Sequence, residues 1–333
     1  MKLSVITQGI STVFTVGILL TCVFPIQAQA DQAQVDWVSP YYRDHTLVGK
    51  IFSTRDQQWL TESKLIEQLK SKQLILLGES HTNTDHHIGQ ARIIEQWLKP
   101  AKPTALVFEM LAYDDWIDYT QPKLDLDSLT AKLEQIAGRW KWPLYQPILQ
   151  LQIAHQLPML GGNLTKQQLD AYSSGDACEV SRNNISLNAC HALPEAQQQE
   201  VKQLIFDAHC GYLTMDDTQP MMHVQAAKDA SFSLAMAEIA DTHQVVLIAG
   251  AIHVRKDIGV PVHLQKLGYS IDQSIVSMAF LNVQEDKHQV EDYFEGSEAD
   301  KQFDYVIFTP SERNQDPCEE FAEQLKKMKH LAK

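Results

Sequence analysis

The stretch Leu74-Ile-Leu-Leu-Gly-Glu-Ser-His81 decides the fold of this chain. Four consecutive apolar residues between Gln73 and Gly78 are typical of a parallel strand that is covered on both faces. In open α/β sheets, ligands bind beyond the carboxyl ends of the strands. Glu79 and His81 directly follow the strand, so we expect both side chains to line a site at that end rather than to enter the core.

Three later stretches have the same form, an apolar run that ends in a polar side chain. Ala105–Glu109 ends in a carboxylate, Pro158–Asn163 in an amide, and Val245–His253 in an imidazole. The carboxyl ends of neighbouring parallel strands meet at one edge of a sheet. We therefore expect these three polar ends to converge on Glu79 and His81.

Strand and helix patterns alternate along the chain with short links, which is the βαβ signature of a parallel sheet. The expected fold is α/β, a mostly parallel sheet flanked by helices, with a smaller helical insert domain. Its parts are a signal peptide at 1–30, an α/β domain at 31–164 and 242–333, and a helical insert or cap without strands at 165–241. The expected outer and later strands are Leu47–Ser53, Met159–Gly162, His243–Ala249, Tyr269–Val276 and Phe303–Phe308. The expected helices include Thr61–Ser71, Asp85–Leu98, Pro194–His209, Gln219–Ala240 and Glu319–Leu331.

The first thirty residues have the features of a secretory signal peptide. Lys2 gives a positive start, Val13–Val23 is mostly apolar, and Ala28–Ala30 has the small-x-small form of a cleavage site. We expect a protein that is exported to the periplasm. The alternative is a lipoprotein anchored to the outer membrane through Cys22, because Leu19-Leu20-Thr21-Cys22 partly resembles a lipobox.

The charge balance argues against one class of partner. The chain has 28 Lys+Arg against 42 Asp+Glu, a net charge of −14. Proteins that bind nucleic acid carry a basic face, so nucleic acid is not an expected partner. The hydrophobic content of 44% supports a sizeable core rather than disorder.

Four cysteines remain after the signal peptide, and an even number in an exported chain suggests two disulfides. Four cysteines allow three connectivities. We favour Cys178 with Cys190, which closes a short loop, and Cys210 with Cys318, which ties the C-terminal segment to the middle of the chain. A metal site at these cysteines is a weak alternative, because none has a Cys-x-x-Cys partner.

The residues after the strands support two kinds of chemistry. A carboxylate and an imidazole two residues apart can bind a metal or act as acid and base. As a divalent-metal site we expect Glu79, His81 and His253, and as the catalytic set of a hydrolase we add Glu109. The structural alternative makes Glu79 a helix cap and His81 an ordinary loop histidine. Thr82 and Asp85 have capping-box spacing, so we expect the following helix to begin there.

Several further residues are candidates for supporting or binding roles. His86 and His87 lie in the first turn of the same helix, where imidazoles tend to stay neutral. Gln225 and Asp229 form a polar pair on an apolar helix face, and we expect them to orient a neighbouring side chain. Histidine and tyrosine are haem-iron ligands, and the link between the two long helices of the insert is rich in both. The candidates there are His209, Tyr212 and His223, with Met221 beside them.

The motifs in combination resemble one family. They are Leu-Leu-Gly-Glu-Ser-His81 with Asp85-His86-His87, Phe108-Glu109-Met110, Trp142-Pro-Leu-Tyr145, Gly162-Asn163, His209-Cys-Gly211, Gln225 with Lys228-Asp229-Ala230, Leu-Ile-Ala-Gly-Ala-Ile-His253 with Asp257-Ile-Gly-Val-Pro261, and Asp316-Pro-Cys318. Together they look like the ChaN family of exported haem-binding proteins, often lipoproteins, in the wider Tiki and erythromycin-esterase-like superfamily.

The resemblance implies a haem-binding protein of iron acquisition, with haem held between the subunits of a homodimer and passed to a haem-uptake machinery. Ferric haem would be ligated by a tyrosine or histidine, with Tyr145 or Tyr212 as the first candidates. Arg255 or Lys256 would lie near the propionates. Lys228 departs from the family, whose members tend to have arginine there, so bidentate pairing would be lost. The competing hypothesis is a metal-dependent hydrolase that uses the Glu/His-lined cleft. Whether the chain is an enzyme stays open at this point.

Overall fold

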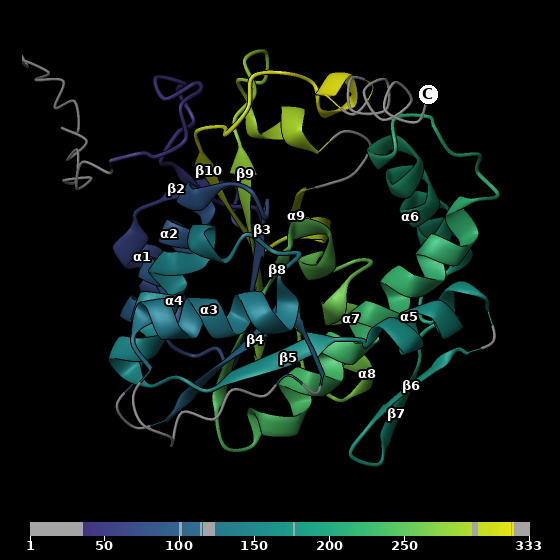
Figure 1. Cartoon of the computed structure of the whole chain (residues 1–333). Helices are drawn as coiled ribbons and strands as arrows, with labels where there is room; N and C mark the ends of the chain where they lie inside the picture. The colour runs from purple at the N-terminus through teal and green to yellow at the C-terminus, as the bar shows by residue number, and fades with distance from the viewer. Residues whose placement is uncertain are drawn as a thin grey trace, which may run out of the picture. The chain divides into compact units, whose positions relative to one another are not determined.

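A computed structural model describes residues 36–99, 102–113, 115, 124–175, 177–294, 299–320 and 322. In this part of the chain an eight-stranded sheet has the order β2-β1-β10-β9-β3-β8-β4-β5 (Figure 1). Its strands are β1 (Ile51–Ser53), β2 (Gln58–Leu60), β3 (Leu74–Glu79), β4 (Thr104–Ala112), β5 (Met159–Asn163), β8 (Gln244–Gly250), β9 (Ile275–Asn282) and β10 (Tyr305–Thr309). The helices are α1 (Glu62–Leu69), α2 (Thr84–Trp97), α3 (Leu126–Ala137), η1 (Trp142–Tyr145), α4 (Gln146–His155), α5 (Lys166–Ser173), α6 (Glu195–Ala208), α7 (Thr218–Ala240), η2 (Ala251–Val254), α8 (Val260–Lys266), η3 (Val290–Tyr293) and α9 (Ala299–Gln302).

The sheet is mostly parallel, as the sequence predicts. Strand β3 lies in its middle, with β8 and β9 hydrogen-bonded to it in parallel, and Leu74 faces Val245 on one side and Ile275 on the other. Strand β4 continues the parallel set beyond β8, and β5 closes it. The outer strands β1 and β2 run antiparallel to their neighbours. The expected α/β class is therefore confirmed.

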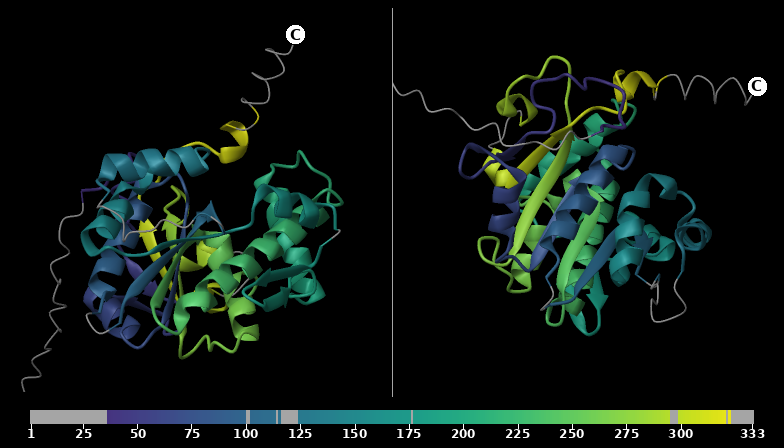
Figure 2. Two further views of the ribbon diagram at one scale, coloured as in Figure 1. Left: turned by 60° about the horizontal axis from the view of Figure 1, so that its bottom comes forward. Right: turned by 90° about the vertical axis from the view of Figure 1, so that its left-hand side faces the viewer.

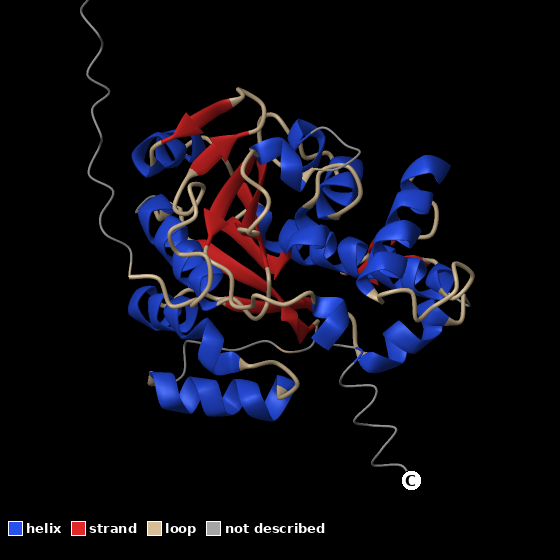
Figure 3. Ribbon diagram, turned by 90° about the horizontal axis from the view of Figure 1, so that it is seen from above, coloured by secondary structure: helices blue, strands red, loops and turns tan. Residues whose placement is uncertain are grey.

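Helices cover both faces of the sheet, which explains the unbroken apolar run in β3 (Figures 2 and 3). Leu74 and Leu76 point to a core cluster that also contains residues of α7 and α8. Ile75 and Leu77 point to a second cluster, with residues of α1, α2, α3 and α4. Because successive strand residues face opposite sides, a strand buried on both faces has no polar alternation.

The N-cap of helix α2 lies one residue later than the sequence predicts. The N-cap is Asn83, whose side chain accepts a hydrogen bond from the Asp85 backbone, and not Thr82. The carboxylate of Asp85 instead accepts the backbone N–H groups of Val38 and Ser39, each at 2.8 Å. Asp85 therefore fixes the N-terminal segment of the described chain to the loop that carries His81.

The predicted strand Tyr269–Val276 is wrong in its position. Strand β9 begins at Ile275, and the preceding residues form a turn in which the carbonyl of Ser270 accepts the N–H groups of Ser274 and Ile275. The polar residues of this turn cannot contribute to a strand that is buried between β3 and β10. The apolar stretch that forms the buried strand is Ile275–Asn282, which comes later in the chain than we expected.

The segment 165–241 contains α5, α6 and α7, as expected, but also a hairpin of β6 (Glu179–Arg182) and β7 (Ile185–Asn188) that the sequence did not predict. Asn183 and Asn184 form its turn with positive φ angles of 47° and 65°. Such a turn is favoured by asparagine and matches the twist of two strands. The boundaries of an insert domain at 165–241 stay a prediction.

Both expected disulfides are present. Cys178 is bonded to Cys190, and Cys210 is bonded to Cys318 across 108 residues of sequence. The first bond closes the hairpin segment, and the second fixes the loop after α6 to the segment after β10. The predicted connectivity is confirmed.

Some predictions lie outside the described residues: the signal peptide at 1–30, the lipid attachment at Cys22, and most of the helix Glu319–Leu331. Among the residues that are described, none of the helices is long and apolar enough to cross a membrane.

The two-sided core predicts which apolar residues matter for stability. Leu76 is fully buried in β3, whereas Ile136 at the end of α3 is 38% exposed. We expect Leu76→Ala to lower the free energy of unfolding by about 3 kcal/mol, because it leaves a cavity in a packed sheet. Ile136→Ala should change it by less than about 1 kcal/mol. Denaturant unfolding followed by circular dichroism measures both, and equal losses would contradict the two-sided core.

Candidate functional site

The strand ends bring the predicted polar residues together. Glu79 is the last residue of β3 and is paired in register with Gly250, the last residue of β8. Glu109 lies in the neighbouring strand β4, and His253 lies in η2, the short helix that directly follows β8. Three adjacent parallel strands thus place their acidic and imidazole side chains at one edge of the sheet.

Glu79 contacts three aromatic side chains, His81, Tyr145 and His87, and is hydrogen-bonded to the first two. Nδ1 of His81 lies 2.9 Å from Oε1 of Glu79, and the Tyr145 hydroxyl donates to the same oxygen at 2.6 Å. Nε2 of His87 lies 3.3 Å from Oε2, and the His87 ring stacks on Tyr145 with centroids 4.0 Å apart. Nδ1 of His87 lies 2.9 Å from the carbonyl oxygen of Leu144. Glu79 is therefore held from three directions.

Glu109 has a second set of partners. Its Oε1 lies 3.3 Å from Nε2 of His253 and 3.8 Å from Nζ of Lys228. Its Oε2 accepts the backbone N–H of Gly250 at 2.8 Å. On the far side of His253, Nδ1 lies 2.6 Å from a carboxylate oxygen of Asp229.

His81 lies between Glu79 and Glu109 and connects their two sets of contacts. Its Nδ1 lies beside Glu79, so in the neutral ring the lone pair is on Nε2. That nitrogen lies 3.5 Å from Oε2 of Glu109, which is at the limit for a direct hydrogen bond. The result is an alternating row of carboxylates and imidazoles. We call it the acid–histidine chain, and its members are Asp229, His253, Glu109, His81, Glu79 and His87.

Access to the acid–histidine chain is uneven. The side chains of Glu79, His87, Asp229, Glu109 and His253 are at most 4% exposed, whereas that of His81 is 31% exposed. An outside molecule therefore meets His81 first. Trp140 covers part of His81, with its ring edge-on to the imidazole at 4.8 Å between centroids.

The two glutamates are carboxylates although they are buried. Burial alone would raise the pKa of Glu79, but the neighbouring His87 and His81 outweigh it and hold the pKa below its usual range. Burial acts in the same way on Glu109, and His253, His81 and Lys228 hold its pKa below the usual range. Two buried negative charges therefore depend on nearby imidazoles.

The pKa values of the two histidines shift in the opposite direction, upward. Burial disfavours the charged form of His253, but Glu109 and Asp229 on its two sides raise its pKa to about 9. The pKa of His81 is also raised, because Glu79 and Glu109 outweigh its burial. Burial and the charge of Glu79 raise the pKa of Tyr145 far above its usual value, so this phenol stays protonated.

Four predicted residues have supporting positions. The amide of Gln225 lies 2.9 Å from Nδ1 of His253, beside Asp229, so both expected orienting residues contact this ring. Asn163 donates to the backbone carbonyl of Glu109 at 2.8 Å, and so fixes β4 rather than contacting the carboxylates. His86 accepts the N–H of Ser80 and contacts the Thr309 hydroxyl, so it holds the loop that carries His81.

The four candidate haem ligands lie in different surroundings. Tyr145 is fully buried and belongs to the cluster around Glu79. Tyr212 is 55% exposed in the loop between α6 and α7. In the same loop, Nδ1 of His209 lies 2.7 Å from the carbonyl oxygen of Ile205. His223 lies in α7, with Nε2 at 2.8 Å from the amide of Gln219.

The two cations expected near haem propionates form ion pairs with protein carboxylates. Arg255 is 6% exposed and forms ion pairs with Glu200 and Asp257. Nζ of Lys256 lies 2.8 Å from Asp304. Arg255 thus connects the segment after η2 with α6, and Lys256 connects it with the residue before β10.

The sequence did not anticipate the roles of Gly250, Trp140 and Tyr145 around His81. Two weak signals were present in the sequence. Gly250 ends the strand that leads to His253, and Tyr145 belongs to a motif rich in aromatic residues. Contacts between distant segments such as η1 and β3 leave no mark in local periodicity.

The expected divalent-metal site finds no support. Among the described residues, no group of three or more His, Cys, Asp or Glu side chains is arranged to hold a metal ion. In the predicted set of Glu79, His81 and His253, the Glu79 carboxylate already contacts His81, His87 and Tyr145.

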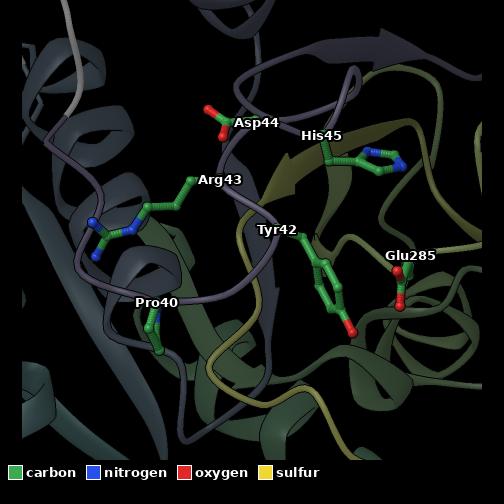
Figure 4. A pocket seen from close by; sticks show the side chains of 6 residues that line it. All are labelled: Pro40, Tyr42, Arg43, Asp44, His45 and Glu285. Carbon is green, nitrogen blue, oxygen red and sulfur yellow. The ribbon is translucent and has the colours of Figure 1, made fainter.

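A pocket of about 400 Å³ lies elsewhere, between the N-terminal segment and the loop after β9. It is lined by Pro40, Tyr42, Arg43, Asp44, His45 and Glu285 (Figure 4).

A solved structure of another protein shows the same fold. A structure of ChaN from Campylobacter jejuni, described as showing cofacial haem binding, has a TM-score of 0.61 and 22% identity, covering 77% of this chain and 95% of that one. A variant of the erythromycin esterase EreC in its open conformation has a TM-score of 0.45 and 10% identity, covering 80% and 99%. The chain matches none of the curated proteins with which it was compared.

The fold and the site define an α/β protein with acids and histidines at the carboxyl edge of a mostly parallel sheet. The model of one family matches residues 65–264, more than half of the chain: haem-binding uptake, Tiki superfamily, ChaN. The chain belongs to this ChaN family of haem-binding proteins.

The raised pKa values of the two histidines predict a dependence of stability on pH. A group whose pKa is higher in the folded state stabilises the fold fully below its unfolded pKa, and the effect is lost as pH rises through the folded pKa. For His253 this window runs from 6.5 to about 9. We expect the free energy of unfolding to fall by up to about 3 kcal/mol across it. Denaturant unfolding at a series of pH values measures this, and His253→Gln should flatten the slope. A slope that His253→Gln leaves unchanged would contradict the assignment.

Proposed function

We propose that this protein binds ferric haem at the loop 209–217 between α6 and α7, with Tyr212 as the axial ligand. Membership of a haem-binding family supports haem as the ligand. The exposure of Tyr212 carries the choice of residue, because a ligand to haem iron must be reached from outside. A tyrosine ligand also suits ferric iron, since the phenolate is a hard, anionic donor.

The buried alternative, Tyr145, is poorly suited to this role. Its hydroxyl donates to Glu79 at 2.6 Å in a fully buried position. Binding to iron would require loss of this bond and of the phenol proton, which burial and the charge of Glu79 oppose by raising the pKa. Breaking a hydrogen bond to a buried carboxylate is costly.

The loop is built to present Tyr212. Cys210 and Gly211 have positive φ angles of 57° and 69°, and the Tyr212 N–H donates to the carbonyl of His209 at 3.0 Å. The disulfide from Cys210 to Cys318 fixes the start of this turn. Met215, 40% exposed, adds apolar surface next to Tyr212. An aromatic and a thioether side chain on a fixed turn suit the flat, apolar face of a porphyrin.

His209 is the second choice of ligand. Its Nδ1–H donates to a backbone carbonyl, which leaves Nε2 with a lone pair. Histidines that bind metals commonly have this arrangement. It lies in the same turn as Tyr212, so both residues favour the same loop.

Because the proposed ligand lies on the surface, one face of the haem would remain exposed in a single chain. We therefore propose a homodimer that shares haem between its subunits. Cofacial haem binding is described for the ChaN of Campylobacter jejuni. Export to the periplasm and delivery to an uptake machinery complete the proposal, with attachment to the outer membrane through Cys22 as the alternative to cleavage after Ala30, and they rest on the sequence and the family.

A haem titration of the mature protein followed by absorbance tests the ligand. We expect Tyr212→Phe to weaken ferric haem binding by about tenfold or more and to change the visible spectrum, because the iron–phenolate bond is lost. Tyr145→Phe is the matched control and should bind haem as the unchanged protein does. Loss of binding in Tyr145→Phe but not in Tyr212→Phe would contradict the proposal. Loss in His209→Ala alone would move the ligand to that residue.

A second candidate function is hydrolysis at the acid–histidine chain. The observation that favours it is the position of His81, the exposed member, whose Nδ1 lies 2.9 Å from Oε1 of Glu79, so that in the neutral ring Nε2 is the base. A base held by a buried carboxylate is the arrangement that activates water for attack on an acyl group. Lys228 lies beside Glu109 and is 21% exposed, so its ammonium can stabilise negative charge that develops on a substrate oxygen.

Hydrolysis of p-nitrophenyl acetate tests this second function. We expect His81→Ala to lower the rate by about a hundredfold, since general-base catalysis is lost. The exposed His191 offers a control, because His191→Ala should leave the rate unchanged. The rate should rise with pH through a pKa above 6.5, because the carboxylates raise the pKa of His81. Equal rates in the two variants would contradict a catalytic role for His81.

A further inference from the structure

The loop 209–217 lies on the surface, and most of its residues are exposed. Its described backbone hydrogen bonds are local. The N–H of Cys210 donates to the carbonyl of Asp207 at 2.9 Å, and that of Asp217 donates to the carbonyl of Thr214 at 3.1 Å. An exposed segment with local hydrogen bonds opens more easily than the core of a domain. The shape of this loop therefore depends on a connection to a more stable part of the molecule.

The backbone of the loop also adopts a conformation that costs free energy. Cys210 has a φ of 57°, in the left-handed region that side chains other than those of asparagine and aspartate seldom adopt. Gly211 follows with a φ of 69°, and together they bring the N–H of Tyr212 to the carbonyl of His209. A residue persists in such a conformation only where its surroundings fix it. At Cys210 a covalent bond from the side chain provides this support.

The disulfide connects the loop to a segment that is well anchored. Cys318 follows Glu312 by a few residues in the segment after β10. The carboxylate of Glu312 accepts the hydroxyl of Thr82 and the amide of Asn282, each at 2.7 Å. The bond from Cys210 to Cys318 therefore ties the loop to the carboxyl edge of the sheet.

A reductant reaches this disulfide more easily than the other one. Cys190 is 8% exposed, so the bond from Cys178 to Cys190 has one buried half. Neither Cys210 nor Cys318 is buried, and the residues directly before Cys318 are exposed. Thiol–disulfide exchange begins when a thiolate reaches one of the two sulfurs. The pair of Cys210 and Cys318 offers two such targets.

We infer that the disulfide from Cys210 to Cys318 is a redox latch on haem binding. When it is oxidised, it holds the loop in the shape that presents Tyr212, and its reduction by a dithiol releases the loop and the haem. The inference rests on the proposed haem function and adds its regulation and a class of partner, a dithiol reductant.

The step is balanced with this one co-reactant. A thiolate of the dithiol attacks one sulfur of the pair, the bond between Cys210 and Cys318 breaks, and the other sulfur leaves as a thiolate that takes up a proton. The second thiol of the reductant then displaces the protein sulfur from the mixed disulfide. The products are two cysteine thiols and one oxidised reductant, so two electrons and two protons have passed to the protein.

Two matched double variants test the latch. Cys210→Ser with Cys318→Ser removes it, whereas Cys178→Ser with Cys190→Ser removes the other disulfide and leaves the loop unchanged. We expect ferric haem affinity, measured by absorbance titration, to fall by about tenfold in the first variant, because fewer molecules have the loop in the binding shape. The second variant should bind haem as the unchanged protein does. Both are titrated at a temperature at which circular dichroism shows them folded. Equal haem affinities in the two variants overturn the inference.

Hydrogen exchange without haem separates the latch from the proposed haem function. Exchange in peptides that cover 209–217 should be faster in the variant without Cys210 and Cys318, and unchanged in the control. Unchanged exchange in both overturns the latch, even if Tyr212→Phe loses haem. Faster exchange with full haem affinity in that variant overturns the redox control of haem. Tyr212→Phe then shows whether the proposed ligand has failed as well.

Stepwise reduction tests the class of partner. The mature protein without haem is treated with increasing dithiothreitol, free thiols are blocked with iodoacetamide, and mass spectrometry identifies the labelled cysteines. We expect Cys210 and Cys318 to be labelled before Cys178 and Cys190, and the partly labelled protein to have the weaker haem affinity. Reoxidation of a sample that was reduced but not labelled should restore the affinity. Labelling in the reverse order, or full haem affinity after labelling of Cys210 and Cys318, overturns the inference.

Discussion

Two buried carboxylates, Glu79 and Glu109, set the conditions for the surrounding structure. A charge without water is tolerated only if it is paired and hydrogen-bonded. The chain meets this requirement by placing an imidazole on each side of each glutamate, with Tyr145 and Gly250 donating further bonds. The strand order supplies the proximity, because β3, β8 and β4 are neighbours in the sheet.

Helix α7 connects this edge of the sheet with the proposed haem loop. It begins at Thr218, directly after the loop 209–217, and its middle carries Lys228 and Asp229 to the acid–histidine chain. Its later residues, including Phe232 and Met236, pack against the sheet. One rigid element therefore positions groups in both proposed sites, and the two functions need not compete for the same side chains.

The sequence was informative wherever a signal was local. The apolar run before Glu79, the glycine and imidazole after β8 and the spacing of the cysteines predicted the parallel sheet, the convergence at its edge and both disulfides. The errors have a common cause in contacts between distant segments. The hydrogen bond from the Tyr145 hydroxyl to Glu79 joins residues 66 positions apart, so the local sequence gives no sign of it. Asn83 caps α2 because Asp85 is already bound to Val38 and Ser39. Strand β9 starts late because its partners β3 and β10 select the apolar stretch that can be buried.

The long disulfide also affects the order in which the chain can fold. Cys178 and Cys190 are 12 residues apart and can pair as soon as the hairpin segment has formed. Cys210 must wait until 108 further residues have followed. Until then the turn with Tyr212 lacks its covalent support, while the sheet is already able to assemble from earlier strands and β8 to β10. Oxidation of this pair is thus expected late in folding, and the loop proposed to bind haem takes its final shape after the core that carries it.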